Sequence, residues 1–305
     1  MRWKNYISLK DSSLKLFFQN EIHDNDNILY ILGKGFDPRM NLGIKMIQNS
    51  NPAVNLELCL IEFNEGRESS SQIYDDFVQK NLIELGNTIF FPKTHTRTID
   101  LWKTVNGKKS RIGDLKAAEL FKDQNDFLKY SYIIIDISAL PRGIYFSLIG
   151  KILSIIDKYM GYNTPNLLIL VSENAEIDSK ITESGIDEDL RYLKGFGGRQ
   201  VLSSTIAPII WFPILGEKKL NHLQKAIQFI SPSEICPILP FPSKNPRRSD
   251  DIFNEHFQFF EDYQIESQNI IYVPEQDPFQ AYRIIKKTIE KYHDSLSILE
   301  VAMLS

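Results

Sequence analysis

Short apolar runs alternate with longer amphipathic segments along most of the chain. Several runs are apolar without the alternation of a half-exposed sheet, which is typical of strands covered on both faces, as in parallel sheets. The pattern predicts strands at 27–33, 54–63, 88–92, 131–138, 166–174, 207–214, 234–239, 269–275 and 296–304.

Segments with helical periodicity fill most of the intervals between these runs. The segment 142–160 is apolar nearly all round, which predicts a buried helix. Asp277 and Pro278 form a helix-start signal ahead of the last predicted helix. The predicted helices cover 39–49, 71–86, 112–130, 142–160, 217–230, 249–262 and 278–294.

This alternation predicts an α/β protein with a Rossmann-like, doubly wound, mostly parallel sheet of about eight strands and helices on both faces. The polar stretch 92–112 interrupts the order and carries an Asn-Gly turn signal, so we predict an inserted hairpin there. A second interruption, 185–206, predicts a mobile or ligand-facing loop whose role is open. Residues 1–175 should form one Rossmann-like half. Residues 176–305 should either continue the same sheet or form a closely packed second domain.

Composition narrows the class of protein. The 305 residues are 43% hydrophobic and 24% charged, which is ordinary for a globular chain with a sizeable core. No window has the roughly 18 apolar residues that span a bilayer, and the first residues lack the apolar stretch of a signal peptide. We therefore expect a cytoplasmic protein with no membrane partner. An apolar run ends close to Ser305, which leaves open whether the chain is a fragment of a longer protein.

Cysteine and charge content argue against two kinds of site. Cys59 and Cys236 lie in apolar runs and are predicted to be buried thiols, and the histidines show no zinc-ligand spacing, so no metal is expected. The net charge is −4 and the basic clusters are short. Duplex nucleic acid is therefore disfavoured as a partner, and a small anion held by a few arginines fits better. A homo-oligomer or a protein partner stays open, and no cofactor is assigned.

In open parallel sheets, ligands bind beyond the carboxyl ends of the strands. After the first predicted strand, Gly33 and Gly35 would let backbone amides approach a ligand, and the next helix start suits a phosphate or carboxylate. Lys34 and Arg39 flank this turn and support that interpretation. The segment matches neither the GxGxxG nor the Walker A pattern. Alternatively, it is an ordinary turn in which Asp37 caps a helix.

The segment after the fourth predicted strand carries Asp136, Ser138 and Arg142. Asp136 closes an apolar run, so its carboxylate should either accept hydrogen bonds from the next loop or face a ligand. Ser138 could cap the following helix or donate to a phosphate. Arg142 opens that helix, where its charge opposes the helix dipole unless an anion offsets it.

Further strand ends also carry charged or polar side chains. Glu173 and Asn174 follow the fifth predicted strand. The proline-rich loop after the seventh strand holds Arg247 and Arg248, which either bind phosphate in bidentate fashion or pair with the acids that follow them. The segment after the eighth strand contributes Glu275, Asp277, Tyr282 and Arg283.

Because the carboxyl ends of parallel strands meet at one edge, these acids and arginines are expected to converge on a common cleft. The first hypothesis is an enzyme of the hydrolase or glycosidic-bond-cleaving type that acts on a nucleotide-like molecule or sugar phosphate. Asp136, Glu173 or Glu275 would act as its general base or stabilise a cationic sugar carbon. A catalytic triad is disfavoured because no GxSxG motif and no histidine occur in these loops.

The second hypothesis is a non-catalytic sensor of a nucleotide signal, or a subunit of a multi-protein complex such as a defence complex. Rossmann-like sensor domains of bacterial defence are similar in general organisation. A third hypothesis is a scaffold, which would have no deep pocket at the strand ends. The residues predicted to bind the ligand are Gly33, Lys34, Gly35, Asp37, Arg39, Ser138, Arg142, Asn174, Arg247, Arg248, Asp277, Tyr282 and Arg283.

Overall fold

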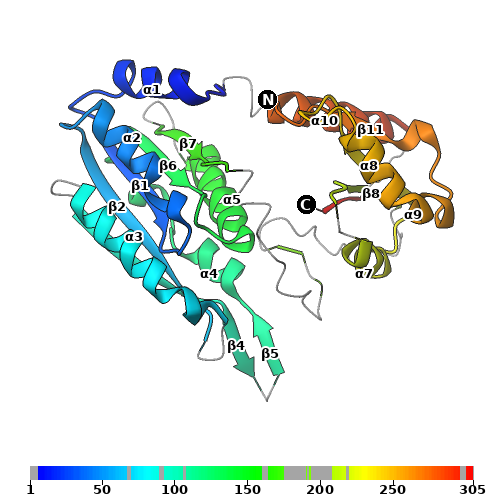
Figure 1. Cartoon of the computed structure of the whole chain (residues 1–305), viewed down its shortest axis with the longest axis horizontal. Coiled ribbons are helices and arrows are strands. Elements are labelled where there is room, and N and C mark those ends of the chain that lie inside the picture. Colours follow the sequence, from blue (N-terminus) through cyan, green and yellow to red (C-terminus); the bar gives the residue numbers. More distant parts are fainter. Residues whose placement is uncertain are drawn as a thin grey trace. The chain divides into compact units, whose positions relative to one another are not determined.

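The chain divides into two compact units. The computed structural model describes residues 6–66, 70–88, 93–105, 108–159, 164–174, 190, 192–193, 208–217, 220–295 and 300–304 (Figure 1). The first unit comprises Met1–Thr182 and Tyr192–Gly197, and the second comprises Glu183–Arg191 and Gly198–Ser305. The predicted loop 185–206 lies almost wholly outside the described residues.

The first unit is built on an open, fully parallel sheet. Its five strands are β1 (Asn27–Gly33), β2 (Asn55–Asn64), β3 (Lys93–Asp100), β6 (Tyr132–Asp136) and β7 (Asn166–Leu170). They lie in the order β3-β2-β1-β6-β7, so the chain starts in the middle and reverses direction across the sheet between β1 and β6. The predicted α/β class with a parallel sheet is confirmed. The predicted size is wrong, because the main sheet has five strands and not about eight.

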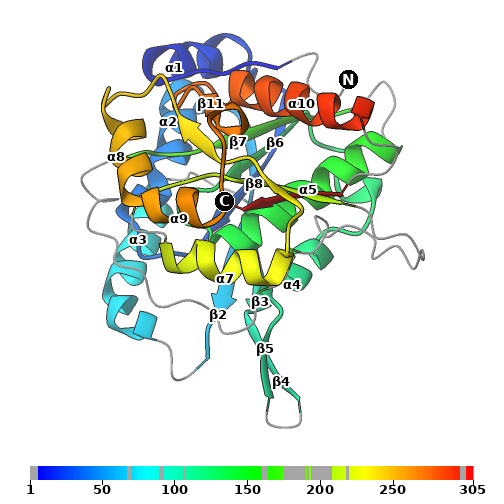
Figure 2. The same ribbon diagram turned by 90° about the vertical axis from the view of Figure 1, so that its right-hand side faces the viewer.

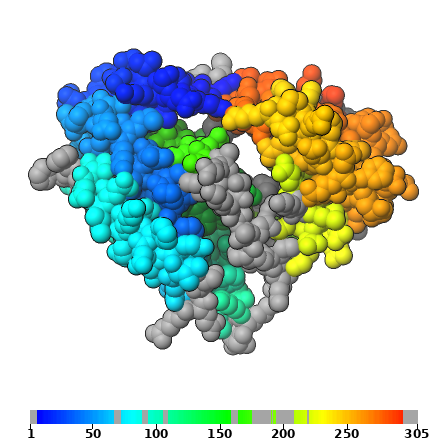
Figure 3. Space-filling view, viewed as in Figure 1, coloured from blue at the N-terminus to red at the C-terminus, as the bar shows by residue number. Residues whose placement is uncertain are grey.

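Helices cover both faces of this sheet, as the right-handed connections between parallel strands require. On one face, α1 (Asp11–Asn20), α2 (Leu42–Ser50) and α3 (Asp75–Thr88) bury Phe18, Ile44 and Leu85 against the strands. These helices form the blue and cyan surface in Figure 3. On the other face, α4 (Gly113–Glu119) and α5 (Arg142–Tyr159) bury Ala117 and Leu148. This double cover explains why six of the seven residues of β1 are buried.

The third strand is polar, and the search for apolar runs misplaced it. Thr88 ends α3, residues 89–92 lie outside the described residues, and the strand is Lys93–Asp100. It is an edge strand in which Ile99 is the buried residue, so alternation is lost and threonine-rich β propensity is the remaining signal. The antiparallel ribbon of β4 (Trp102–Val105) and β5 (Lys108–Arg111) follows it, where Figure 2 shows it extending from the sheet. The ribbon therefore occupies only the second half of the stretch 92–112.

Two helices of the first unit differ from the predicted ones. The sequence pattern missed α1, which is mostly polar and buries Phe18. The predicted helix 112–130 ends as an α-helix at Glu119. Beyond it, Asp123 caps a short 3₁₀ helix, Gln124–Asp126, through its own side chain. This local side-chain hydrogen bond competes with helix continuation, as Asp commonly does.

The second unit has its own short parallel strands. Strand β8 (Ile209–Pro213) pairs with β9 (Glu234–Ile235) and β12 (Glu300–Leu304), and β10 (Ile238–Pro240) pairs with β11 (Ile271–Val273). A parallel bridge between Ile214 and Ile238 connects the two groups. The strands therefore follow the order β12-β8-β9/β10-β11. As in the first unit, the first strand lies inside and the next strands add on one side before the chain crosses to the other.

Helices also cover this second set of strands. On one side, α7 (Leu220–Ile230), α8 (Arg248–Glu255) and α9 (Phe257–Asp262) pack around Trp211. On the other, α10 (Pro278–Ser295) packs against Phe212. Successive side chains of a strand point to opposite faces of the sheet. Trp211 and Phe212, neighbours in β8, therefore lie in different cores. In both units the inward-facing residues of the strands form the core, and the loops are left at the strand ends.

Two further predictions concern burial and membranes. Cys59 and Cys236 are free and buried, as predicted from their apolar surroundings. Among the described residues, no helix combines the length and apolar character needed to cross a bilayer.

Candidate functional site

A chain of hydrogen bonds joins the carboxyl ends of β1, β6 and β7. Asp136, the last residue of β6, is fully buried, and its Oδ2 accepts a 2.6 Å hydrogen bond from Tyr30 Oη. Its Oδ1 accepts one from the backbone N–H of Ser138 at 3.0 Å. Ser138 Oγ accepts from the N–H of Ser172 at 2.9 Å, and Arg39 donates to the carbonyl of Ser172 at 3.2 Å. The topology therefore brings Arg39, Asp136 and Ser138 together.

Burial and hydrogen bonding shift the pKa values of Asp136 and Tyr30. Burial raises the pKa of Asp136, and the hydrogen bonds from Ser138 and Tyr30 oppose that effect only in part. Burial and the neighbouring Asp136 also raise the pKa of Tyr30, which stays protonated and donates. Of the two expectations for Asp136, the observed geometry has the carboxylate accepting hydrogen bonds inside the protein.

Asp37 and Arg39 form a second, tightly connected pair. Asp37 caps the 3₁₀ helix Pro38–Asn41 by accepting from the N–H of Arg39 at 2.8 Å. It also accepts from Arg39 Nε at 2.9 Å and from Arg39 Nη2 at 2.6 Å. Burial raises the pKa of Asp37, but the hydrogen bonds and charge of Arg39 outweigh it and the net shift is downward. Because Arg39 is only 8% exposed and fully engaged, it is a poor candidate for holding a ligand.

The two glycines after β1 allow a close approach of two loops. A Cβ on Gly33 would lie 2.6 Å from the carbonyl oxygen of Ala139, and one on Gly35 would lie 3.0 Å from Ala139 Cβ. The loop after β6 thus packs directly on the loop after β1, at the place where the strand order reverses. Lys34, between the glycines, forms an ion pair with Glu62 of β2. In this structure Gly33 and Gly35 allow the two loops to pack against each other.

Three predicted residues of the first unit stay accessible. Arg142 is exposed at the first position of α5, and no described acidic side chain forms an ion pair with it. Glu173 and Asn174 are exposed just beyond β7. A ligand from solvent could reach Arg142 and Glu173 without breaking the hydrogen bonds around Asp136.

In the second unit, Arg248 joins three strand ends. Arg248 lies at the start of α8, after β10, and forms ion pairs with Glu275 beyond β11 and with Glu217 beyond β8. Glu275 also accepts from the N–H of Lys244 at 2.9 Å. The alternative in which Arg248 pairs with the acids just after it in sequence is therefore not what the structure shows. Arg247, its neighbour, is exposed.

The remaining predicted residues lie on the first turns of α10. Asp277 accepts from the N–H of Gln280 at 2.9 Å, which is a helix cap. Tyr282 and Arg283 are exposed one turn later. Glu275, Arg247, Arg248 and these residues belong to the second unit, so their predicted convergence with Asp136 and Arg142 stays a prediction.

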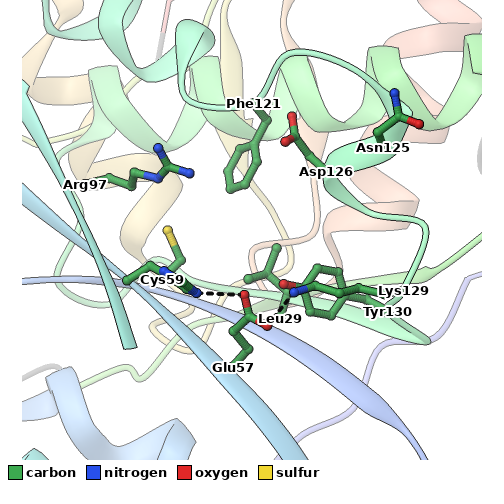
Figure 4. Close-up of a pocket in the computed structure, with 10 residues that line it drawn as sticks. Leu29, Glu57, Cys59, Arg97, Phe121, Asn125, Asp126, Lys129 and Tyr130 are labelled. Carbon is green, nitrogen blue, oxygen red and sulfur yellow. Dashed lines mark hydrogen bonds and ion pairs between the residues drawn. The ribbon is translucent and has the colours of Figure 1, made fainter. Parts of the chain in front are cut away.

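Sequence reasoning missed a pocket on the α4–α5 face of the first sheet (Figure 4). The register pairs Cys59 with His95 and Ile61 with Arg97, so alternate residues of β2 and β3 share this face. Glu57, a charged residue between the buried Leu56 and Leu58 of β2, was the available signal. The pocket is lined by Leu29, Glu57, Cys59, His95, Arg97, Phe121, Asn125, Asp126, Lys129 and Tyr130.

Metal-ligating groups and similarity to known proteins bear on the nature of the site. No group of three or more His, Cys, Asp or Glu side chains able to hold a metal ion occurs in the part of the chain that the structure describes. The sequence matches no protein-family model, and no curated protein matches it significantly. The fold and the site therefore define an α/β protein with a parallel sheet, and its function has to be inferred from its side chains.

We predict that Gly43→Ala destabilises the protein by about 1–3 kcal/mol, because an added methyl group overpacks a filled site. A Cβ at Gly43 would lie 2.5 Å from Tyr30 Oη and 2.7 Å from Asp136 Oδ2. Gly86→Ala, in α3 with nothing within 4 Å of its Cβ, is the matched control and should stabilise by about 0.5–1 kcal/mol. Urea unfolding measures both. Equal effects of the two substitutions would show that Gly43 does not pack on the Tyr30–Asp136 pair.

The two carboxyl groups should affect stability with opposite dependence on pH. Asp37 has a lowered pKa, so its stabilisation is complete above the unfolded pKa of about 3.9 and is lost as the pH falls through the folded pKa. Asp136 has a raised pKa, so its contribution is most favourable below about pH 3.9 and declines as the pH rises.

Unfolding free energies of the wild type, Asp37→Asn and Asp136→Asn from about pH 3.5 to about pH 7 test this. The cost of Asp37→Asn should shrink toward low pH, and the cost of Asp136→Asn should shrink toward neutral pH. If both variants parallel the wild type across the range, these carboxyls do not have the shifts assigned to them.

Proposed function

We propose that this Rossmann-like chain is a binding protein for a phosphorylated or nucleotide-like small molecule, and that it works as a non-catalytic sensor. One observation carries the proposal. At the strand ends, Asp136 and Glu275 are engaged by hydrogen bonds and an ion pair within the protein, whereas Arg142 and Arg247 are exposed.

The engaged acids are poor general bases. A general base must come within hydrogen-bonding distance of the proton it removes, about 2.6–3.2 Å. Asp136 is fully buried between Tyr30 and Ser138, and Glu275 is held by Arg248 and by the backbone of Lys244. Removing Asp136 from its partners would leave the buried hydroxyl of Tyr30 unsatisfied, which costs roughly 1–3 kcal/mol.

The exposed cations suit an anionic ligand. Arg142 stands at the start of an 18-residue helix, where the helix dipole adds to its attraction for a phosphate. Arg247 and Lys244 are exposed in the loop after β10. A guanidinium group binds two phosphate oxygens at once, so one arginine provides both affinity and orientation.

The hydrolase or glycosidase interpretation is the second candidate, and it depends on Glu173. Of the three acids proposed for catalysis, Glu173 is the exposed one, and it accepts no hydrogen bond from another described residue. It follows β7, next to Ser172, which contacts both Arg39 and Ser138. An exposed carboxylate beside an anion site is the arrangement that general-base catalysis would need.

We predict that Arg142→Ala and Arg247→Ala each weaken binding of a phosphorylated ligand by about tenfold, the value of one charge-assisted hydrogen bond. Calorimetry would compare AMP and ribose 5-phosphate with adenosine and ribose. Lys158→Ala, at the other end of α5, and Lys287→Ala, on α10, remove exposed charges away from the strand ends and serve as controls. Equal affinity for phosphorylated and unphosphorylated compounds, or equal losses in the controls, would exclude the anion site.

We also predict that the protein leaves these compounds chemically unchanged. Wild type and Glu173→Gln would be incubated with AMP, ribose 5-phosphate and a nucleoside, and the products separated by chromatography. A sensor gives no products with either protein. Turnover by the wild type that Glu173→Gln abolishes would instead establish the hydrolase interpretation.

A further inference from the structure

The pocket on the α4–α5 face lies in the first unit and is separate from the strand-end residues. Its volume is about 290 Å³, near the small end of the range for ligand sites. Leu29 and Cys59 belong to its floor, in the interior of β1 and β2. The ring of Phe121 stands over Cys59, as Figure 4 shows, and Tyr130 closes another side. The floor and two walls are therefore apolar or aromatic.

The acidic groups of the pocket already have partners. Glu57 forms an ion pair with Lys129 at 2.7 Å, and His95 Nε2 lies 3.1 Å from its other carboxylate oxygen. Burial raises the pKa of Glu57, but its hydrogen bonds from Lys129 and Tyr130 and the nearby cations lower it overall, so the group is an ionised and neutralised carboxylate. Asp126 Oδ2 accepts from the backbone N–H of Lys122 at 2.7 Å.

Among the described residues, Arg97 is the cation of the pocket that forms no ion pair with an acidic side chain. Its guanidinium group extends over Cys59 and beside Phe121 (Figure 4), and no described acidic side chain forms an ion pair with it. Burial raises the pKa of Cys59 to about 11, so this thiol is neutral at physiological pH and does not offset the charge of Arg97. The guanidinium group of Arg97 is therefore the group of the pocket with which an anionic ligand could pair, while Asp126 adds one carboxylate to the lining.

We propose that this pocket binds a small aromatic anion, a carboxylate or phosphate monoester on a single or fused ring. The ring would pack between Phe121 and the floor around Cys59, and the anionic group would accept hydrogen bonds from Arg97. A flat apolar body fits the walls, and the pocket volume limits it to one or two rings. The site is additional to the anion sites proposed at the strand ends, since Arg97 points across the sheet face from β3.

The experiment measures binding of phenyl phosphate and benzoate, with benzyl alcohol and benzylamine as the neutral and cationic counterparts. The protein is the full chain carrying Arg142→Ala and Arg247→Ala, which removes the two arginines proposed to hold an anion at the strand ends. The anions should bind at least about tenfold more tightly than their counterparts, by calorimetry or ligand-observed NMR. Arg97→Gln should remove this preference, and Arg97→Lys should keep part of it. Lys93→Gln, on the same strand and face outside the pocket, should stay within about twofold of the parent.

Two results would overturn the proposal. One is equal binding of the anionic, neutral and cationic compounds, and the other is unchanged anion binding by Arg97→Gln. Circular dichroism and the unfolding midpoint of Arg97→Gln exclude loss of fold as the cause of lost binding. Because Arg142 and Arg247 are replaced throughout, failure of this site leaves the separate test with AMP and ribose 5-phosphate unaffected.

Discussion

A carboxyl group buried at the centre of the sheet edge constrains the first unit more than any other single interaction. Asp136 is fully buried and has two acceptor oxygens, so both must find donors. Tyr30 provides one from the neighbouring strand, and the loop after β6 must fold back so that the N–H of Ser138 provides the other. Gly43 and Gly33 are where helix and loop come close enough for this arrangement.

The burial of Asp136 gives this acid a structural role, different from that of the exposed Arg142. The loop that provides a donor to Asp136 also positions Ser138 to accept from Ser172, whose carbonyl accepts from Arg39. The polar groups of these residues are therefore hydrogen-bonded to one another. Arg142 is exposed at the start of α5, and Glu173 is the acid left exposed beyond β7. An edge of this kind can attract and orient an anion, while the buried carboxylate holds the edge in shape. A buried carboxylate beside an exposed arginine favours binding of an anion over catalysis of proton transfer.

Sequence patterns predicted the parts of the fold that depend on burial, and missed those that depend on partners. Strands covered on both faces, such as β1 and β6, are uninterrupted apolar runs, whereas β3 has one buried residue and no such run. Likewise, residue type and position located Arg39 and Arg142 equally well after their strands. Only the fold shows that Arg39 is 8% exposed and bound to Asp37, and that Arg142 is exposed.

The pocket near Arg97 depends on local hydrogen bonds that end α4 and turn the chain. Helix α4 ends at Glu119, and the chain then turns under the caps of Asp123 and Asp126 without continuing as a helix. The carboxyl end of β3 is therefore covered, as the burial of Ile99 shows, but its first residues are not. An uncovered polar strand beside a covered apolar one leaves Arg97 over an apolar floor. The segment predicted as helix is a turn in the structure, and this turn leaves the pocket open on the sheet.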